Sequence, residues 1–169
     1  KDPADLKAAQ QLLAKLRPNV RYIGYGTLST DLANGNICLA LTYSGDASTA
    51  QAQVTETKQN FEVIYRIPRE GTLLWADSMA MPANAPHPEA AKAFIEFMMR
   101  PASMAELTNA LYYANANKAS TPLVDKAVSD DPNIYPPQDV RAKLFSEEML
   151  PAKVLRERTR AWADFRAQK

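Results

Sequence analysis

Two short stretches of the sequence each bring an aromatic ring and a carboxylate to the end of a predicted strand. In the first, Tyr43 closes an apolar run and Asp46 follows Gly45 at the start of a predicted helix. In the second, Trp75 and Asp77 are two residues apart, so both project from the same face of a strand. Aromatic faces attract cations, and carboxylates accept hydrogen bonds from ammonium groups. These residue types therefore favour binding of a small organic cation.

Each of these residues also has a purely structural interpretation. An aromatic strand residue such as Tyr43 commonly fills a hydrophobic core. An aspartate after a glycine, such as Asp46, is an ordinary helix N-cap. Burial of Asp77 within an apolar strand is costly unless the carboxylate is paired, but Asp77 lies in solvent if the strand has already ended. The residues alone leave these alternatives open.

The composition is typical of a globular protein with one compact domain. Of 169 residues, 46% are hydrophobic and 23% are charged, and the net charge is +1. This balance gives no indication of nucleic acid or an anionic membrane as a partner. No apolar run approaches the ~20 residues that span a bilayer. The polar first residues do not form a signal peptide, so the chain is expected to begin within a mature protein.

The elements that must position the aromatic and acidic residues alternate along the first half of the chain. Apolar spacing predicts helices over Pro3–Leu16, over a short segment that ends at Ala33, and over Asp46–Gln59. The nearly continuous apolar run Ile37–Tyr43 predicts a strand buried on both faces. Alternating helices and strands are typical of a sheet covered by helices, so an α/β fold is expected. The predicted strands are Val20–Ile23, Ile37–Tyr43, Phe61–Ile67 and Leu73–Met81.

Beyond residue 82 the pattern indicates helices only. This helical tail has no strands of its own to cover, so it must pack on the earlier sheet or on one that the chain does not contain. The predicted helices are His87–Met99, Ser103–Leu111, Pro122–Val128, Gln138–Phe145 and Ala152–Ala167.

Several segments occur along the whole chain in an informative order: Asp31–Ala40 with Ser44–Asp46, Tyr112–Ala119, Tyr135–Pro137, Val140–Phe145 and Arg158–Trp162. In these segments the sequence resembles the periplasmic solute-binding proteins of ABC importers, and most closely those that bind the polyamines putrescine and spermidine. Proteins of that family have about twice this length. They consist of two α/β lobes joined by crossing strands, with the ligand in the cleft between the lobes. The chain resembles their C-terminal half.

The resemblance implies a fold of the periplasmic binding protein type II, as a partial α/β chain with an α-helical C-terminal tail. Residues 1–68 would then be part of the second lobe. Residues 69–110 would supply a crossing strand and helices of the first lobe, and residues 111–169 would be a helical tail that returns to the second lobe.

The resemblance also implies a ligand site made of Tyr43, Asp46, Trp75, Asp77 and Tyr113. Tyr43 occupies a position where the family often has tryptophan. The aspartates would pair with ammonium groups, the rings would pack on the carbon chain, and Tyr113 would close the site. No catalysis, cofactor or metal is expected. The expected partners are a polyamine and the membrane permease, and the expected location is the periplasm.

Other interpretations of the sequence stay open. Tyr112 and Tyr113 are adjacent, as are the phenolate ligands of related ferric-ion binding proteins. An enzyme with Cys38 as nucleophile lacks a clear base, because His87 is distant in sequence. The chain could also be a non-binding structural fragment, or a homodimer in which two copies exchange elements. Cys38, the single cysteine, is either a small strand residue or half of a disulfide with a partner outside the chain.

Overall fold

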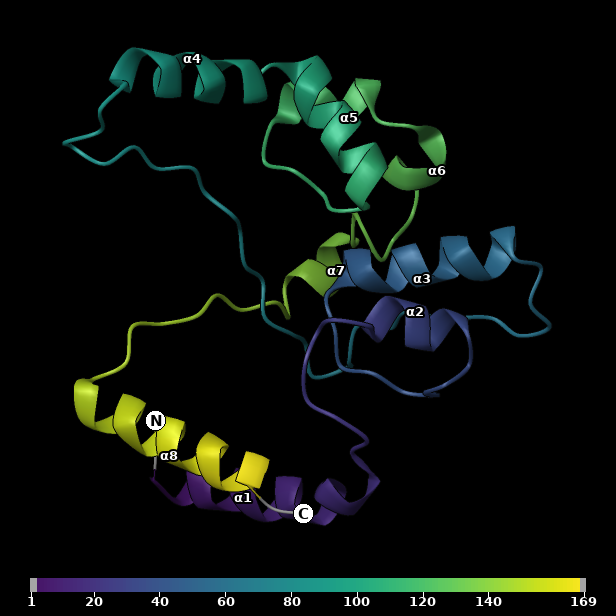
Figure 1. Ribbon diagram of the computed structural model, residues 1–169, viewed down its shortest axis with the longest axis vertical. Helices are drawn as coiled ribbons and strands as arrows, with labels where there is room; N and C mark the ends of the chain where they lie inside the picture. The colour runs from purple at the N-terminus through teal and green to yellow at the C-terminus, as the bar shows by residue number, and fades with distance from the viewer. Residues whose placement is uncertain (1–2, 168–169) are drawn as a thin grey trace. The chain divides into compact units, whose positions relative to one another are not determined.

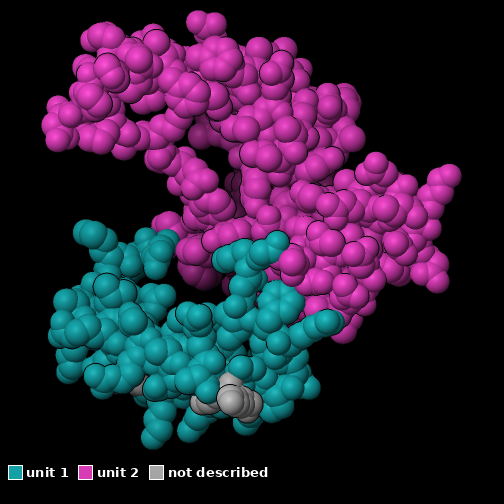
Figure 2. All heavy atoms as spheres, viewed as in Figure 1, with its two compact units in different colours: residues 1–26, 147–169 teal, residues 27–146 magenta. Residues whose placement is uncertain are grey.

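The computed structural model describes residues 3–167, which form helices joined by irregular segments (Figure 1). The chain divides into two compact units (Figure 2). Unit 1 combines residues 1–26 with residues 147–169, and unit 2 contains residues 27–146. The longer helices are α1 (Pro3–Leu16), α3 (Ser44–Glu56), α4 (Pro88–Met98), α5 (Pro101–Leu111) and α8 (Ala152–Ala167). The shorter ones are η1 (Arg17–Asn19), α2 (Leu28–Ala33), η2 (Lys118–Leu123), α6 (Lys126–Ser129) and α7 (Gln138–Arg141).

The four predicted strands are wrong, because the described residues do not pair into a sheet. Among the described residues, the only ladder contact is an isolated parallel bridge between Leu73 and Phe145. The predicted strand at residues 37–43 is not buried on both faces, because Leu39 is 88% exposed and Leu41 is 96% exposed. A strand requires a neighbouring backbone to satisfy its N–H and C=O groups. No strand is formed within the described chain over residues 20–23, 37–43, 61–67 or 75–81.

The helix predictions are confirmed in position, although several of the predicted ends differ from the observed ones. The predicted bounds of α1 and α8 match the observed ones. Helix α5 begins earlier than predicted, since Pro101 is suited to the first helical turn. The predicted helix Pro122–Val128 is instead divided between η2, which contains Pro122, and α6.

Helix α7 is shorter than the predicted helix Gln138–Phe145 because the backbone of Phe145 is used elsewhere. The Phe145 N–H donates to the Thr72 carbonyl at 3.2 Å, and the Leu74 N–H donates to the Phe145 carbonyl at 2.8 Å. These two bonds form the isolated bridge, so Phe145 cannot continue a helical ladder from Gln138.

The core of unit 2 consists of two small hydrophobic clusters. In the first, α2 lies against α3, and Leu28, Leu32 and Ala50 are buried together (Figure 1). In the second, residues of α5 and of the segment around α6 meet. Its buried members are Ala105, Val124, Val128 and Ile134, with Tyr112 and Tyr135 packed against them.

Unit 1 is built from helices at opposite ends of the chain. Helices α1 and α8 lie side by side (Figure 1) and line a pocket of about 370 Å³. The Arg17 side chain donates from Nε to the Phe165 carbonyl at 3.2 Å, and the rings of Trp162 and Phe165 are 5.4 Å apart. Over residues 3–167, none of the helices has the length and hydropathy that a membrane span requires.

Candidate functional site

Three aromatic rings from separate segments of unit 2 meet at the N-terminus of α3. Tyr43 is the N-cap residue of α3, Trp75 lies in the segment after the Leu73 bridge, and Tyr113 follows the end of α5. The centroids of Tyr43 and Trp75 are 4.9 Å apart, and those of Trp75 and Tyr113 are 6.2 Å apart. Both pairs have the tilted or edge-on geometry that aromatic rings prefer. We call these three rings the aromatic trio; Trp75 is its central member.

The aromatic trio is partly open to solvent. Trp75 is 42% exposed and Tyr43 is 40% exposed, although both rings contact a neighbour. An apolar surface of this kind, built from three rings, can accept the methylenes of a ligand and attract a cation to the ring faces.

Asp46 supplies a carboxylate beside the aromatic trio. The Thr42 hydroxyl donates to Asp46 Oδ2 at 2.9 Å, and no hydrogen bond from the described residues reaches Oδ1. Asp46 lies in the first turn of α3, where the positive end of the helix dipole stabilises a negative charge. The interpretation of Asp46 as the N-cap is wrong, because Tyr43 holds that position. One carboxylate oxygen therefore stays available to a ligand.

Gly45 provides the space in which Tyr113 is seated. A Cβ atom at Gly45 would overlap the Tyr113 ring and would lie 2.6 Å from the Leu111 carbonyl oxygen. The backbone amides of Asp46 and Gly45 lie close enough to the Tyr113 hydroxyl to influence its pKa. The absence of a side chain at residue 45 thus lets the phenol reach the first turn of α3.

The electrostatic surroundings of Tyr113 favour its neutral form. Burial raises the pKa of the phenol above 10.0, and the negative charge of Asp46 raises it further. The backbone amides of Asp46 and Gly45 oppose this shift, but the pKa is raised on balance. Tyr113 is therefore a neutral hydroxyl in the site at physiological pH.

This shift predicts a loss of stability in alkaline solution. The folded chain holds the Tyr113 proton to a higher pH than the unfolded chain, so the contribution of Tyr113 to stability is complete below pH 10.0. It is lost as the pH rises through the folded-state pKa. We expect Tyr113→Phe to show a shallower fall in the free energy of unfolding above pH 10.0, measured by urea denaturation.

Burial also raises the pKa of Tyr65, so Tyr65→Phe is expected to remove a separate part of the same alkaline fall. If Tyr113→Phe and the unsubstituted chain lose stability with the same slope, Tyr113 does not titrate as the structure requires.

A buried network of polar side chains holds the segment that follows Tyr113. Asn115 Nδ2 donates to Thr108 Oγ1 at 2.8 Å, and Asn115 Oδ1 accepts from Ser120 Oγ at 2.9 Å and from the Asn117 N–H at 2.8 Å. Thr108 and Ser120 are 2% and 0% exposed. Sequence reasoning missed this role of Asn115. The only available signal was that Asn115 and Asn117 alternate with alanines shortly after the two tyrosines.

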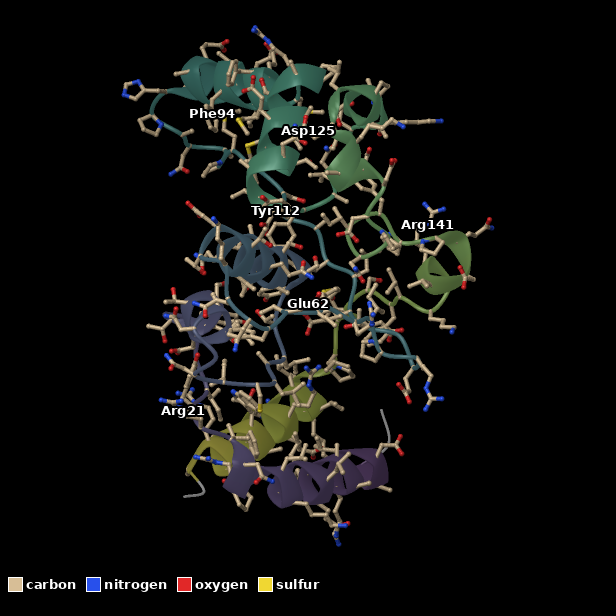
Figure 3. All side chains as sticks on the ribbon, turned by 90° about the vertical axis from the view of Figure 1, so that its right-hand side faces the viewer. Arg21, Glu62, Phe94, Tyr112, Asp125 and Arg141 are labelled. Atoms are coloured by element: carbon tan, nitrogen blue, oxygen red, sulfur yellow. The ribbon has the colours of Figure 1, made fainter. Side chains whose placement is uncertain are left out.

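The two adjacent tyrosines contact different parts of unit 2. Tyr112, labelled in Figure 3, is the left-handed C-cap of α5 with φ 58°. It packs on the hydrophobic cluster that contains Ala105 and Ile134. Tyr113 instead lies against Trp75 and Gly45. The expectation of paired phenolate ligands is therefore not met by this geometry. The residues described here also contain no group of three or more His, Cys, Asp or Glu suited to a metal ion.

Two other predicted residues lie apart from these contacts. Asp77 is exposed, and no hydrogen bond or ion pair joins it to the described residues. Its assignment to the ligand site stays a prediction. Cys38 is a free, exposed thiol, so it is not the small buried strand residue that one interpretation expected.

Comparison with known proteins decides the family. A family model described as bacterial extracellular solute-binding protein matches residues 1–136. The chain belongs to this family. The predicted fold class, that of the periplasmic solute-binding proteins as a partial chain, is confirmed by the family model and by a solved structure.

Individual relatives of the chain are named for polyamines. It is 44% identical to the putrescine-binding periplasmic protein SpuD of Pseudomonas aeruginosa, over 99% of the chain and 46% of that protein. It is 43% identical to the putrescine-binding periplasmic protein PotF of Escherichia coli, over 100% of the chain and 47% of that protein. The chain thus spans about half the length of these relatives. The resemblance to the polyamine-binding group is confirmed.

A solved structure agrees with these relatives. The putative spermidine/putrescine ABC transporter from Listeria monocytogenes superposes with a TM-score of 0.84 at 28% identity. The match covers 99% of this chain and 50% of that one. The relatives in all three comparisons are named as binding or transport proteins rather than as enzymes.

Proposed function

We propose that the chain is part of the solute-binding component of an ABC importer, and that it binds a polyamine and delivers it to a membrane permease. The observation that carries this proposal is the aromatic trio beside Asp46, in a chain that is 44% identical to a putrescine-binding protein. A polyamine combines ammonium groups with an apolar carbon chain, and the site offers a matching carboxylate and ring faces. The periplasmic location of the named relatives supports the same location for this protein.

In the proposed complex, the carbon chain of the polyamine packs on Trp75 and one ammonium group donates to Asp46 Oδ1. Tyr43 and Tyr113 flank Trp75 and shield the ligand from water. Asp77 receives a second ammonium group, as the resemblance implies. The neutral Tyr113 hydroxyl adds no repulsive or competing charge. The binding energy comes from cation–π contacts and charge-assisted hydrogen bonds, without any chemical reaction.

The wider organisation is part of the same proposal. Residues 1–68 would belong to one lobe, residues 69–110 to the crossing strand and helices of the other, and residues 111–169 to the returning tail. The exposed thiol of Cys38 is available for a disulfide with a cysteine outside the chain. The comparisons give no support to a homodimer, and the proposal does not include one.

The proposal is tested by calorimetric titration of the folded chain with putrescine, spermidine and a ferric salt. We expect saturable binding of a polyamine. Asp46→Asn and Asp77→Asn should each weaken it by about 10-fold or more, since a hydrogen bond to a charged group contributes about 1.5–3 kcal/mol.

Asp5→Asn is the matched control, because Asp5 is an exposed aspartate of α1 in unit 1. It removes the same charge and should leave the affinity unchanged. An equal loss in Asp5→Asn would show that only net charge matters. Saturable binding of the ferric ion, with none of the polyamines, would favour the iron alternative.

A further inference from the structure

A pocket of unit 2, distinct from the aromatic trio, has several basic residues in its lining. It has a volume of about 280 Å³, and Arg66, Arg69 and Lys143 are among its lining residues. No acidic residue lines it. The chain as a whole carries a net charge of only +1, so this concentration of positive charge is a local feature and does not reflect the composition.

The segments that carry these three cations are tied together by backbone contacts. The turn after Arg66 is closed by a hydrogen bond from the Gly71 N–H to the Pro68 carbonyl at 3.0 Å. Gly71 has φ +95°, and the backbone of Lys143 lies directly against it, where a side chain would not fit. Two residues further on, the bridge between Leu73 and Phe145 joins the same two segments. The backbone segments that carry Arg69 and Lys143 are thus held next to each other by these contacts.

Proline residues give the pocket stiff walls. Pro68, Pro132 and Pro137 line it, and each has a φ angle fixed by its ring. Ile134, which follows the wall residue Asn133, is buried in the hydrophobic cluster of Val124 and Val128. The pocket is therefore attached to the core rather than formed by a free loop.

The positive charges have little compensation within the described part of the chain. No ion pair involves Arg66, Arg69 or Lys143, and the Arg66 guanidinium makes only a long hydrogen bond of 3.4 Å to the adjacent Tyr65 carbonyl. Glu70 and Asp139 are close in sequence but do not line the pocket. Like charges around one hollow repel each other, and a bound anion removes that repulsion.

We propose that this pocket binds a small phosphate-type polyanion. Arginine presents a planar fork that matches phosphate oxygens, and lysine adds a compact point charge. The volume lies just below the ~300–1,000 Å³ of typical ligand pockets, so the ligand is of the size of a diphosphate group. The same chemistry occurs in a free diphosphate and in the phosphate headgroup of an anionic lipid. This inference is independent of the proposed polyamine function.

The test is calorimetric titration of the full chain with pyrophosphate at low salt. We expect saturable binding that weakens as salt is added. Arg69→Gln and Lys143→Gln should each reduce the affinity by about 10-fold or more. The matched control is Arg156→Gln, since Arg156 is an exposed arginine of α8 outside the pocket. It should bind pyrophosphate as the unsubstituted chain does.

The outcomes separate the alternatives. Absence of saturable pyrophosphate binding overturns the proposal, and so does an equal loss of affinity in Arg69→Gln and Arg156→Gln. In a second arm, flotation with phosphatidylglycerol vesicles that pyrophosphate displaces would assign the site to a lipid headgroup. Pyrophosphate binding without vesicle binding would assign it to a free anion. Putrescine binding should be unchanged in Arg69→Gln, which keeps this test apart from that of the proposed function.

Discussion

Gly45→Ala is expected to lower the free energy of unfolding by about 1–3 kcal/mol, the usual cost of an added methyl group in a filled space. The new Cβ would overlap the ring of Tyr113 and would lie 2.6 Å from the Leu111 carbonyl oxygen. A ring can rotate away, but the Leu111 oxygen belongs to the backbone at the end of α5. The substitution must therefore move either α3 or the end of α5.

The higher helix propensity of alanine opposes the expected loss of stability. Alanine favours a helix over glycine by about 0.8–1.0 kcal/mol in a helix interior, and Gly45 lies in the first turn of α3. If helix propensity decided the result, Gly45→Ala would stabilise the chain. We expect the overlap with Tyr113 and Leu111 to outweigh this gain.

Gly24→Ala is the matched control, because a Cβ at Gly24 would meet nothing within 4 Å. Its stability should stay within about 0.5 kcal/mol of the original. Urea denaturation of the two variants gives the comparison. A Gly45→Ala chain that is as stable as the original and still binds putrescine would contradict the prediction. It would show that the close contact between Tyr113 and Gly45 is not required.

Trp75→Ala is expected to weaken putrescine binding by about 30-fold, corresponding to about 2 kcal/mol for a cation–π contact that is largely desolvated. Trp75 is the central ring of the aromatic trio, so its removal takes away contacts to both Tyr43 and Tyr113. Trp75→Phe keeps a ring at the same place and should retain most of the affinity. Calorimetric titration measures both variants.

Trp162 provides a close control for Trp75. It is the other tryptophan of the chain, it is 46% exposed against 42% for Trp75, and its ring also contacts an aromatic neighbour, Phe165. It lies in unit 1, whereas Trp75 lies in unit 2. Trp162→Ala should leave putrescine affinity unchanged. Equal losses in both variants would indicate a general effect on folding and would contradict the assigned role of Trp75.

The helices could be predicted from the sequence because their signals are local. In α1 and α8, apolar residues recur at helical spacing, and the predicted bounds agree with the observed ones. The strands were not obtained as paired elements, because pairing depends on distant backbone that spacing does not encode. Leu39 and Leu41 lie in an apolar run that is typical of a buried strand, but no neighbouring strand covers them among the described residues.

The candidate site was predictable only in part. Tyr43 and Trp75 were selected as separate aromatic–carboxylate pairs, and the structure brings their rings to within 4.9 Å. Tyr113 was assigned from the family resemblance, since it is distant in sequence from both. The seat at Gly45 was missed, although a glycine inside the first turn of a helix is a local signal of close approach. Asn115 was missed because a hydrogen-bond network has no sequence periodicity.

Because unit 1 is built from α1 and α8, the two units can fold at different times during synthesis. On the ribosome, α1 emerges before unit 2, but its packing partner α8 emerges only after all of residues 27–146 have been made. Domains that consist of consecutive residues can fold as they emerge, and unit 2 is of this kind. Unit 1 must instead close a loop that contains the whole of unit 2, at an entropic cost that grows only slowly with loop length. Released chains truncated before Ala152 should therefore protect unit 2 from protease while α1 is still cleaved.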